Sequence, residues 1–208
     1  MKLLAKKLNN SLKSLSPLRM KIGLFFGSFN PFHIGHKIIA SYFVEFSDLE
    51  KVFYVVSPQN PFKEKKTLLD QNHRLQIIRA EVEDNPKLAV SDIEFQLSKP
   101  SYTIDTLIHL EERYPEDEFN LIMGADNIKN FHKWKNYEQI LSDYSIYVYP
   151  RSGIEINGKH ENIHIVNDVP QMEISSSFIR KAIKEGKDVS YLIPEKAWVY
   201  IDEMNFYK

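Results

Sequence analysis

The segment Gly27-Ser28-Phe29-Asn30-Pro31-Phe32-His33-Ile34-Gly35-His36 follows the apolar stretch 22–26 and leads into a helix-like run. A buried strand that passes through a turn of small residues into a helix directs backbone N–H groups, reinforced by the helix dipole, at one point in front of the sheet. His33 and His36 lie three residues apart in the first helical turn, so both side chains project toward that point. The segment therefore predicts a binding site for a polyphosphate.

Short apolar segments alternate with helix-like segments along the chain. The strand pattern covers residues 22–26, 52–56, 88–95, 119–123, 144–149 and 163–166. The helix pattern covers residues 35–46, 70–84, 103–113, 136–142, 176–185 and 195–204. Such alternation predicts an α/β fold in which helices cover both faces of a mainly parallel sheet, with ligands bound beyond the carboxyl ends of the strands.

The composition limits the classes of protein to consider. A chain of 208 residues with 43% hydrophobic residues suits one domain with a sizeable core. Because 27 Lys and Arg residues face 28 Asp and Glu residues, no overall field favours nucleic acid or an anionic membrane, and small-molecule partners are expected. Without cysteine there is no disulfide, thiolate metal site or cysteine nucleophile. No apolar stretch approaches the ~20 residues of a membrane span, so we expect a cytoplasmic protein. Assembly into a homo-oligomer is left open.

Residues 1–19 differ from the rest of the chain, with five basic residues, no acidic residue and leucines at roughly helical spacing. The apolar run there is too short for a secretion signal. Three interpretations remain: a loosely packed extension or a start upstream of Met20, a helix that docks on the domain or a partner, and a surface anchor. We assign residues 20–208 to a single domain and leave the role of 1–19 open.

The two histidines have alternative explanations. Either could cap or pack at a helix start, as lone histidines usually do. Zinc sites commonly use histidines four apart with a third ligand, and no cysteine or His-Glu pattern supports such a site here. Phosphate contact is therefore favoured over zinc, and we assign no residue as a metal ligand.

A serine run precedes the helix expected at 176–185, in Ile174-Ser175-Ser176-Ser177-Phe178-Ile179-Arg180. A serine at this position commonly serves as an N-cap. The same helix start would also present N–H groups and hydroxyls to an anion, and Arg180, one turn on, adds a fork of donors for phosphate oxygens. The two helix starts are expected to hold one triphosphate from two sides.

Together these motifs resemble the His-x-Gly-His and Ile-Ser-Ser-x-x-Ile-Arg signatures of the nucleotidylyltransferase superfamily, which implies its Rossmann-like fold. Three further segments resemble the bacterial nicotinate mononucleotide adenylyltransferases within it. They are Asn60-Pro61-Phe62-Lys63, Ser101-Tyr102-Thr103-Ile104-Asp105-Thr106-Leu107, and Met123-Gly124-Ala125-Asp126 leading to Trp134. The resemblance runs in order from about Met20 to the end of the sequence.

The resemblance implies two sets of binding residues. Those implied for ATP are Gly27, Ser28, Phe29, His33, His36, Gly124, Asp126, Ser175, Ser176, Ser177, Phe178 and Arg180. Those implied for the mononucleotide are Ser28, Asn30, Lys63, Tyr102, Thr103 and Trp134. His33, His36 and Arg180 take the catalytic role, the histidines on the α and β phosphates and Arg180, with the serine helix start, on the β and γ phosphates.

Several of these residues also have plain structural interpretations. Tyr102 and Thr103 could cap a helix, Asp126 could be an N-cap, and Lys63 could be a solvated charge. Trp134 could simply pack, although its polar neighbours are unusual for a core tryptophan and suit stacking on a pyridine ring.

The sequence departs from the family pattern at two positions. Phe62 replaces a frequent histidine, and Phe131 replaces a usual leucine. Both changes concern the fit of the substrate and not the class of reaction.

The implied reaction is attack of the 5′-phosphate of nicotinate mononucleotide on the α-phosphorus of ATP, which gives nicotinate adenine dinucleotide and pyrophosphate in NAD biosynthesis. The nucleophile is already an anion, so positioning and electrostatic stabilisation are expected to carry the catalysis. Mg²⁺ is expected as a cofactor bound through substrate phosphates.

Four rival functions differ from this one. Two are adenylyltransferases of the same fold that act on nicotinamide mononucleotide or phosphopantetheine, and the sequence leaves the choice between the acid and the amide base open. A class I aminoacyl-tRNA synthetase would need further motifs and a much longer chain. A non-catalytic nucleotide sensor would be expected to lack a phosphate-contact residue, whereas His33, His36 and Arg180 are all present.

Overall fold

In the part of the chain that the structure describes, six strands form one sheet in which every neighbouring pair is parallel. The computed structural model describes residues 19–58, 68–154 and 160–208. Across the sheet the strands follow the order β3 (Leu88–Ser91), β2 (Lys51–Val56), β1 (Lys21–Gly27), β4 (Glu118–Gly124), β5 (Ile146–Tyr149) and β6 (Ile163–Ile165). The chain moves outward from β1 through β2 and β3 and then returns to the other side of β1 at β4. The carboxyl ends of β1 and β4 therefore form the switch point where ligands bind in open parallel sheets.

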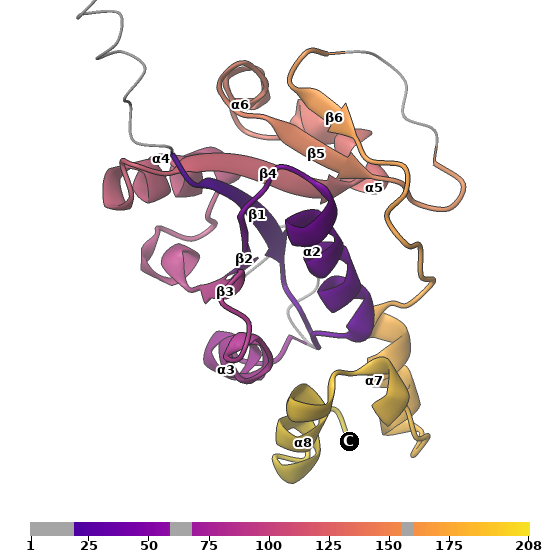
Figure 1. The fold of residues 1–208 in the computed structure, drawn as a ribbon. Helices are drawn as coiled ribbons and strands as arrows, with labels where there is room; N and C mark the ends of the chain where they lie inside the picture. The colour runs from indigo at the N-terminus through magenta and orange to yellow at the C-terminus, as the bar shows by residue number, and fades with distance from the viewer. Residues whose placement is uncertain (1–18, 59–67, 155–159) are drawn as a thin grey trace, which may run out of the picture.

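Helices connect the strands and cover the sheet (Figure 1). They are α2 (Ile34–Phe46), α3 (Gln71–Val82), α4 (Thr103–Arg113), α5 (Ala125–Ile128), α6 (Tyr137–Asp143), α7 (Ser176–Lys184) and α8 (Glu195–Glu203). Short 3₁₀ turns are η2 (Ile93–Gln96), η3 (Phe131–Lys133) and η4 (Ser190–Leu192).

Alternate strand residues enter two separate cores, because successive side chains of a strand point to opposite faces. Phe25 and Tyr149 pack in one core with side chains of α2, α3, α7 and α8. Leu24 and Val148 pack in the other with side chains of α4 and α6. Both faces of the sheet are thus buried, as is usual for parallel sheets. The predicted architecture of a parallel sheet with helices on both faces is confirmed.

The strand predicted at 88–95 is too long. β3 ends at Ser91, and η2 follows it, with the N–H of Phe95 donating to the carbonyl of Asp92. Ile93 is buried in the second core from this 3₁₀ turn. A short apolar run indicates that residues are buried but does not determine their backbone conformation. For this reason the pattern predicted a strand that is too long.

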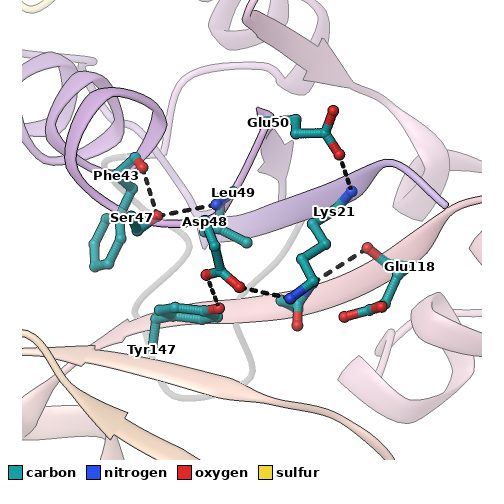
Figure 2. Close-up of polar contacts among 9 residues, drawn as sticks. Lys21, Phe43, Ser47, Asp48, Leu49, Glu50, Glu118 and Tyr147 are labelled. Atoms are coloured by element: carbon teal, nitrogen blue, oxygen red, sulfur yellow. Dashed lines mark hydrogen bonds and ion pairs between the residues drawn. The ribbon is translucent and has the colours of Figure 1, made fainter. Parts of the chain in front are cut away.

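A polar cluster ties the amino end of β1 to neighbouring elements (Figure 2). The Lys21 ammonium pairs with Asp48 Oδ2 at 2.5 Å, and the Tyr147 hydroxyl donates to the other oxygen of Asp48. The Lys21 N–H donates to Glu50 Oε1 at 3.1 Å. These contacts join β1, β5 and the turn after α2 at the amino ends of the strands. The switch point lies at the opposite, carboxyl ends.

Candidate active site

The turn between β1 and α2 is held in one conformation by packing. Phe29 has a positive φ of 45°, which is uncommon for a residue with a side chain. Its buried ring folds back over Gly27, where an added Cβ would lie 2.8 Å from Phe29 Cζ. Gly27 is therefore required by a close approach of the ring, and the turn directs the chain into α2.

Aromatic rings surround His36 at the start of α2. The centroid of its ring lies 3.6 Å from that of His33 and 5.6 Å from that of Phe32, both stacked, and the edge contact with Phe29 is at 5.0 Å. The backbone N–H of His33 donates to His36 Nδ1 at 3.2 Å. Because Nδ1 accepts this N–H, a single ring proton of His36 lies on Nε2.

His33 is the N-cap residue of α2 and is buried. Burial, with a smaller contribution from the positive charge of Arg151, lowers the pKa of its imidazole to about 4. The ring is therefore neutral near pH 7. Among the described residues, none forms a hydrogen bond with Nδ1 of His33. A Cβ at Gly35 would lie 3.1 Å from this atom, so the glycine of the His-x-Gly-His motif makes room for the ring.

The serine motif docks directly on the β1–α2 turn. Ser175 is the N-cap of α7, and its Oγ accepts the N–H of Phe178 at 3.1 Å, which confirms the predicted capping role. The Ser176 hydroxyl donates to the carbonyl of Pro31 at 2.9 Å. The Arg180 guanidinium donates to the carbonyl of Asn30 at 2.6 Å and to Ser177 Oγ at 3.4 Å. The predicted convergence of the two motifs is found in the structure.

A hollow of about 260 Å³ lies between the two helix starts. His33, His36 and Ser175 line it together with Tyr149 and Arg151. A larger hollow of about 460 Å³ lies along α4 and contains none of the predicted site residues. The smaller hollow is the candidate for the triphosphate.

The end of β4 supplies a carboxylate beside this hollow. Gly124 is the N-cap of α5, and a Cβ there would meet Asp126 Oδ1 at 2.4 Å. The alternative that Asp126 is an N-cap is therefore wrong, since Asp126 lies in the first turn. It is exposed and pairs with Arg151 Nε at 3.6 Å, while Arg151 lies over the ring of Tyr149 at 5.2 Å. Arg151 was not predicted, although its place after the end of β5 could have identified it by the carboxyl-end rule.

Two of the residues predicted for the mononucleotide, Tyr102 and Thr103, lie at the start of α4. Tyr102 is the N-cap residue of α4 and Thr103 its first residue, as the capping interpretation required. Tyr102 is exposed, and Lys135 Nζ lies 4.6 Å from the centroid of its ring. Trp134 is half-buried against Phe131, with ring centroids 5.3 Å apart. It packs on the second core and still has an exposed part for a ligand.

The other residues of this set have different outcomes. Asn30 is buried, and its Oδ1 accepts the N–H of Leu69 at 3.1 Å and the hydroxyl of Tyr207 at 2.8 Å. It therefore has a structural role, and its contact with the mononucleotide stays a prediction. Ser28 is half-buried in the β1–α2 turn. Lys63 and the departure at Phe62 lie outside the described residues.

Arg74 and Glu94 support the site and were not predicted. Arg74 is fully buried, and burial lowers the pKa of its guanidinium to about 10. It donates to backbone carbonyls at the ends of β1 and β2 and before α3, on Leu69, Ser28, Ser57 and Pro58. Glu94 accepts hydroxyls from Ser101 and Thr106, and burial raises the pKa of its carboxyl. No local pattern distinguishes either residue from a solvated charge.

Residues 24–182 match the family described as cytidylyltransferase-like. The chain belongs to the cytidylyltransferase-like family. Two bacterial relatives of this cytidylyltransferase-like chain carry the name "Probable nicotinate-nucleotide adenylyltransferase". The relative from Flavobacterium johnsoniae is 54% identical over 91% of this chain and 100% of its own length. That from Bacteroides thetaiotaomicron is 44% identical over 89% of this chain and 92% of its own length.

Solved structures share the fold of this cytidylyltransferase-like chain. The nicotinic acid mononucleotide adenylyltransferase of Plasmodium falciparum, solved in complex with NaAD, has a TM-score of 0.75 at 20% identity. The match covers 91% of this chain and 98% of the other. At this level of identity the comparison establishes the Rossmann-like nucleotidylyltransferase fold.

The described ranges hold neither a cluster of metal ligands nor a helix suited to span a membrane. No three carboxylate, imidazole or thiol side chains in these ranges gather as ligands for a metal ion. None of the helices there combines the length and the apolarity that crossing a bilayer requires.

Proposed function

We propose that this chain is a nicotinate-nucleotide adenylyltransferase, which joins ATP and nicotinate mononucleotide to give nicotinate adenine dinucleotide and pyrophosphate. The observation that carries the proposal is the docking of α7 on the β1–α2 turn, which gathers His33, His36 and the start of α7 around one hollow. Relatives at 44–54% identity that span nearly the whole chain bear the same activity in their names.

The site suits a triphosphate by its donors. The starts of α2 and α7 present backbone N–H groups at the positive ends of their helix dipoles. His33 is neutral and would contribute one N–H, and His36 would donate through Nε2. Arg180 has five N–H donors, and its contacts with Asn30 and Ser177 use part of that set. We assign the α and β phosphates to the histidines and the β and γ phosphates to Arg180 and the start of α7.

The chemical step needs little proton transfer. A phosphate oxygen of the mononucleotide attacks the α-phosphorus of ATP, the bond from that phosphorus to the bridging oxygen breaks, and the electron pair leaves on pyrophosphate. Because both reactants are anions, the barrier comes from their repulsion and from charge that grows on the leaving group. Preorganised donors lower both contributions, and the two adjacent imidazoles are placed to supply such donors.

The magnesium ion belongs to the substrate in this proposal. His33, His36 and Arg151 line the hollow with nitrogen donors, and Glu173 adds one carboxylate to the lining. Mg²⁺ commonly binds through one or two carboxylates together with substrate phosphates, so this lining suits an ion that arrives with ATP. Bound through the phosphate oxygens of ATP, Mg²⁺ would neutralise negative charge on the departing pyrophosphate.

The nicotinate mononucleotide would lie toward Tyr102, Thr103 and Trp134. The exposed part of the Trp134 indole offers a face for the pyridine ring, a contact worth roughly 1 kcal/mol beyond area burial. The N–H groups at the start of α4 suit a carboxylate. This arrangement favours the acid over the amide base.

The test is pyrophosphate release from Mg-ATP with nicotinate mononucleotide, nicotinamide mononucleotide or phosphopantetheine at matched concentrations. We expect release that strongly favours nicotinate mononucleotide. Equal or faster release with the amide would place the chain in a dual or amide-specific branch. Release with none of the three would leave the sensor function as the explanation of the site.

A further inference from the structure

Asn30 connects the turn between β1 and α2, in which it lies, with three other parts of the molecule. Its backbone carbonyl accepts from Arg180 of α7, and its side-chain Oδ1 accepts from the N–H of Leu69, just before α3. The fourth part is the segment after α8, because the hydroxyl of Tyr207 donates to the same Oδ1 at 2.8 Å. These partners lie up to 177 residues from Asn30 in the sequence.

The segment after α8 is folded back against the domain by several contacts. Asn205 and Tyr207 have positive φ angles of 55° and 68°, a conformation that costs energy for residues with side chains and persists where packing fixes it. The Phe206 ring lies 4.8 Å from that of His73 on α3, and its N–H donates to the carbonyl of Ile201. The end of the chain lies on the same side of the molecule as α3 and α7 (Figure 1).

We propose that Tyr207 is a positioning residue of the phosphate site: its hydroxyl orients Asn30, and the Asn30–Pro31 carbonyls in turn orient Arg180 and the start of α7. The second half of this path is the pair of contacts that α7 makes, Arg180 on the carbonyl of Asn30 and Ser176 on that of Pro31. The inference rests on the proposed function, in which Arg180 and the start of α7 contact ATP.

The charges around Tyr207 agree with this path. Burial raises the pKa of its hydroxyl, while the positive charges of Arg180 and Arg74 act in the opposite direction. Arg74 holds Leu69, the second partner of the Asn30 Oδ1, since its Nε donates to the carbonyl of Leu69 at 2.9 Å.

The experiment measures the affinity for Mg-ATP of the full chain by calorimetry in four proteins: the unchanged chain, Tyr207→Phe, Arg180→Ala and the double variant. Loss of one hydrogen bond corresponds to an affinity loss of about fivefold. We expect that loss for Tyr207→Phe in the unchanged background and less than about twofold in the Arg180→Ala background, since residues that act through one another are not additive.

Tyr200→Phe is the matched control. It also removes a hydroxyl from a half-buried tyrosine near the end of the chain, one that contacts His73 Nδ1 at 3.0 Å and not Asn30. Both variants are expected to lower the midpoint of thermal unfolding slightly, whereas only Tyr207→Phe weakens Mg-ATP binding. If Tyr207→Phe does not fold, Tyr207→His, which keeps a ring N–H donor, is measured in the same two backgrounds.

The results separate this inference from the proposed function. Unchanged affinity in Tyr207→Phe, or the same loss in both Arg180 backgrounds, would overturn the positioning role while pyrophosphate release by the unchanged chain still supports the function. Coupling without pyrophosphate release would support the positioning role and contradict the function. Failure of the unchanged chain to bind Mg-ATP would overturn both.

Discussion

His33 is the N-cap residue of α2, and its buried side chain lines the candidate site. Its ring stacks on that of His36 with centroids 3.6 Å apart, and Gly35 leaves the space that the ring occupies. A charged ring in this place would have to lose its hydration without a carboxylate to compensate, because the nearby charge is the positive one of Arg151. The site is therefore built around a neutral imidazole.

This burial makes stability depend on pH. The pKa of His33 is about 4 in the folded chain against an ordinary value of 6.5, so between these pH values the unfolded chain binds a proton that the folded chain does not. The free energy of unfolding should fall as the pH falls through this window, by up to about 3 kcal/mol, and this loss should be absent above it. Urea unfolding of the unchanged chain and His33→Gln from pH 4 to 7 measures the difference.

The exposed histidine of α4 provides the control, as His109→Gln, which removes a histidine without emptying a buried site. The difference between the unchanged chain and His33→Gln should shrink as the pH falls, while His109→Gln should follow the unchanged chain. Parallel pH profiles for the unchanged chain and His33→Gln would show that this burial does not destabilise the folded state in acid.

At the scale of elements, the two ends of the sheet have separate tasks. Lys21, Asp48 and Tyr147 form the cluster at the amino end, while the site occupies the carboxyl end (Figure 2). Burial raises the pKa of the Asp48 carboxyl, but the hydrogen bonds from Lys21 and Tyr147 outweigh it and hold the pKa below its ordinary value. Asp48 therefore contributes stability above the ordinary pKa of an aspartate, and loses it as the pH falls through the lowered value.

Asp48→Asn should lower the free energy of unfolding at pH 7 by about 0.5–1 kcal/mol, a modest loss because the pair is partly exposed. Turnover should not change, because the cluster lies at the amino ends of the strands and the site lies at their carboxyl ends. Glu45→Gln is the matched control, since its ion pair with Lys87 is similarly exposed and has no second donor from a tyrosine. A smaller loss in Asp48→Asn than in Glu45→Gln, or reduced turnover, would contradict this account.

The elements show what the sequence predicts well. The central strand and the helix start at Ser175 are set by local signals, an apolar run and a capping serine, and both were predicted. The strand predicted around β3 was too long because Ile93 lies in the 3₁₀ turn that follows β3 and is nevertheless buried in the core. Local pattern thus locates an element better than it fixes its end.

The supporting residues could not be predicted for a different reason. Arg74 and Tyr207 act through contacts with Ser28 and Asn30 that cross 46 and 177 residues of sequence. An arginine in a helix or a tyrosine after one is ordinarily a surface residue, and only the assembled fold shows that these two lie beneath the site. The carboxyl-end rule could have identified Arg151, which lies two residues after the end of β5.

At the scale of the whole molecule, the sheet order explains why the two motifs meet. Because β1 lies between β2 and β4, the carboxyl ends of β1 and β4 open the switch-point crevice, and α7 docks on the turn after β1 from 150 residues away. The hollow between the two helix starts is lined by the imidazoles of His33 and His36, by Ser175 at the start of α7 and by the guanidinium of Arg151. In the proposed function, this assembly transfers the adenylyl group of ATP to nicotinate mononucleotide.

The most direct test follows ATP labelled at its α-phosphorus in a single turnover with nicotinate mononucleotide and Mg²⁺. The account predicts that the label appears in the dinucleotide, and that His36→Ala slows its appearance about 10²- to 10³-fold, as for the loss of one preorganised donor, while His109→Ala does not. Absence of label from the dinucleotide, or an unchanged rate in His36→Ala, would contradict it.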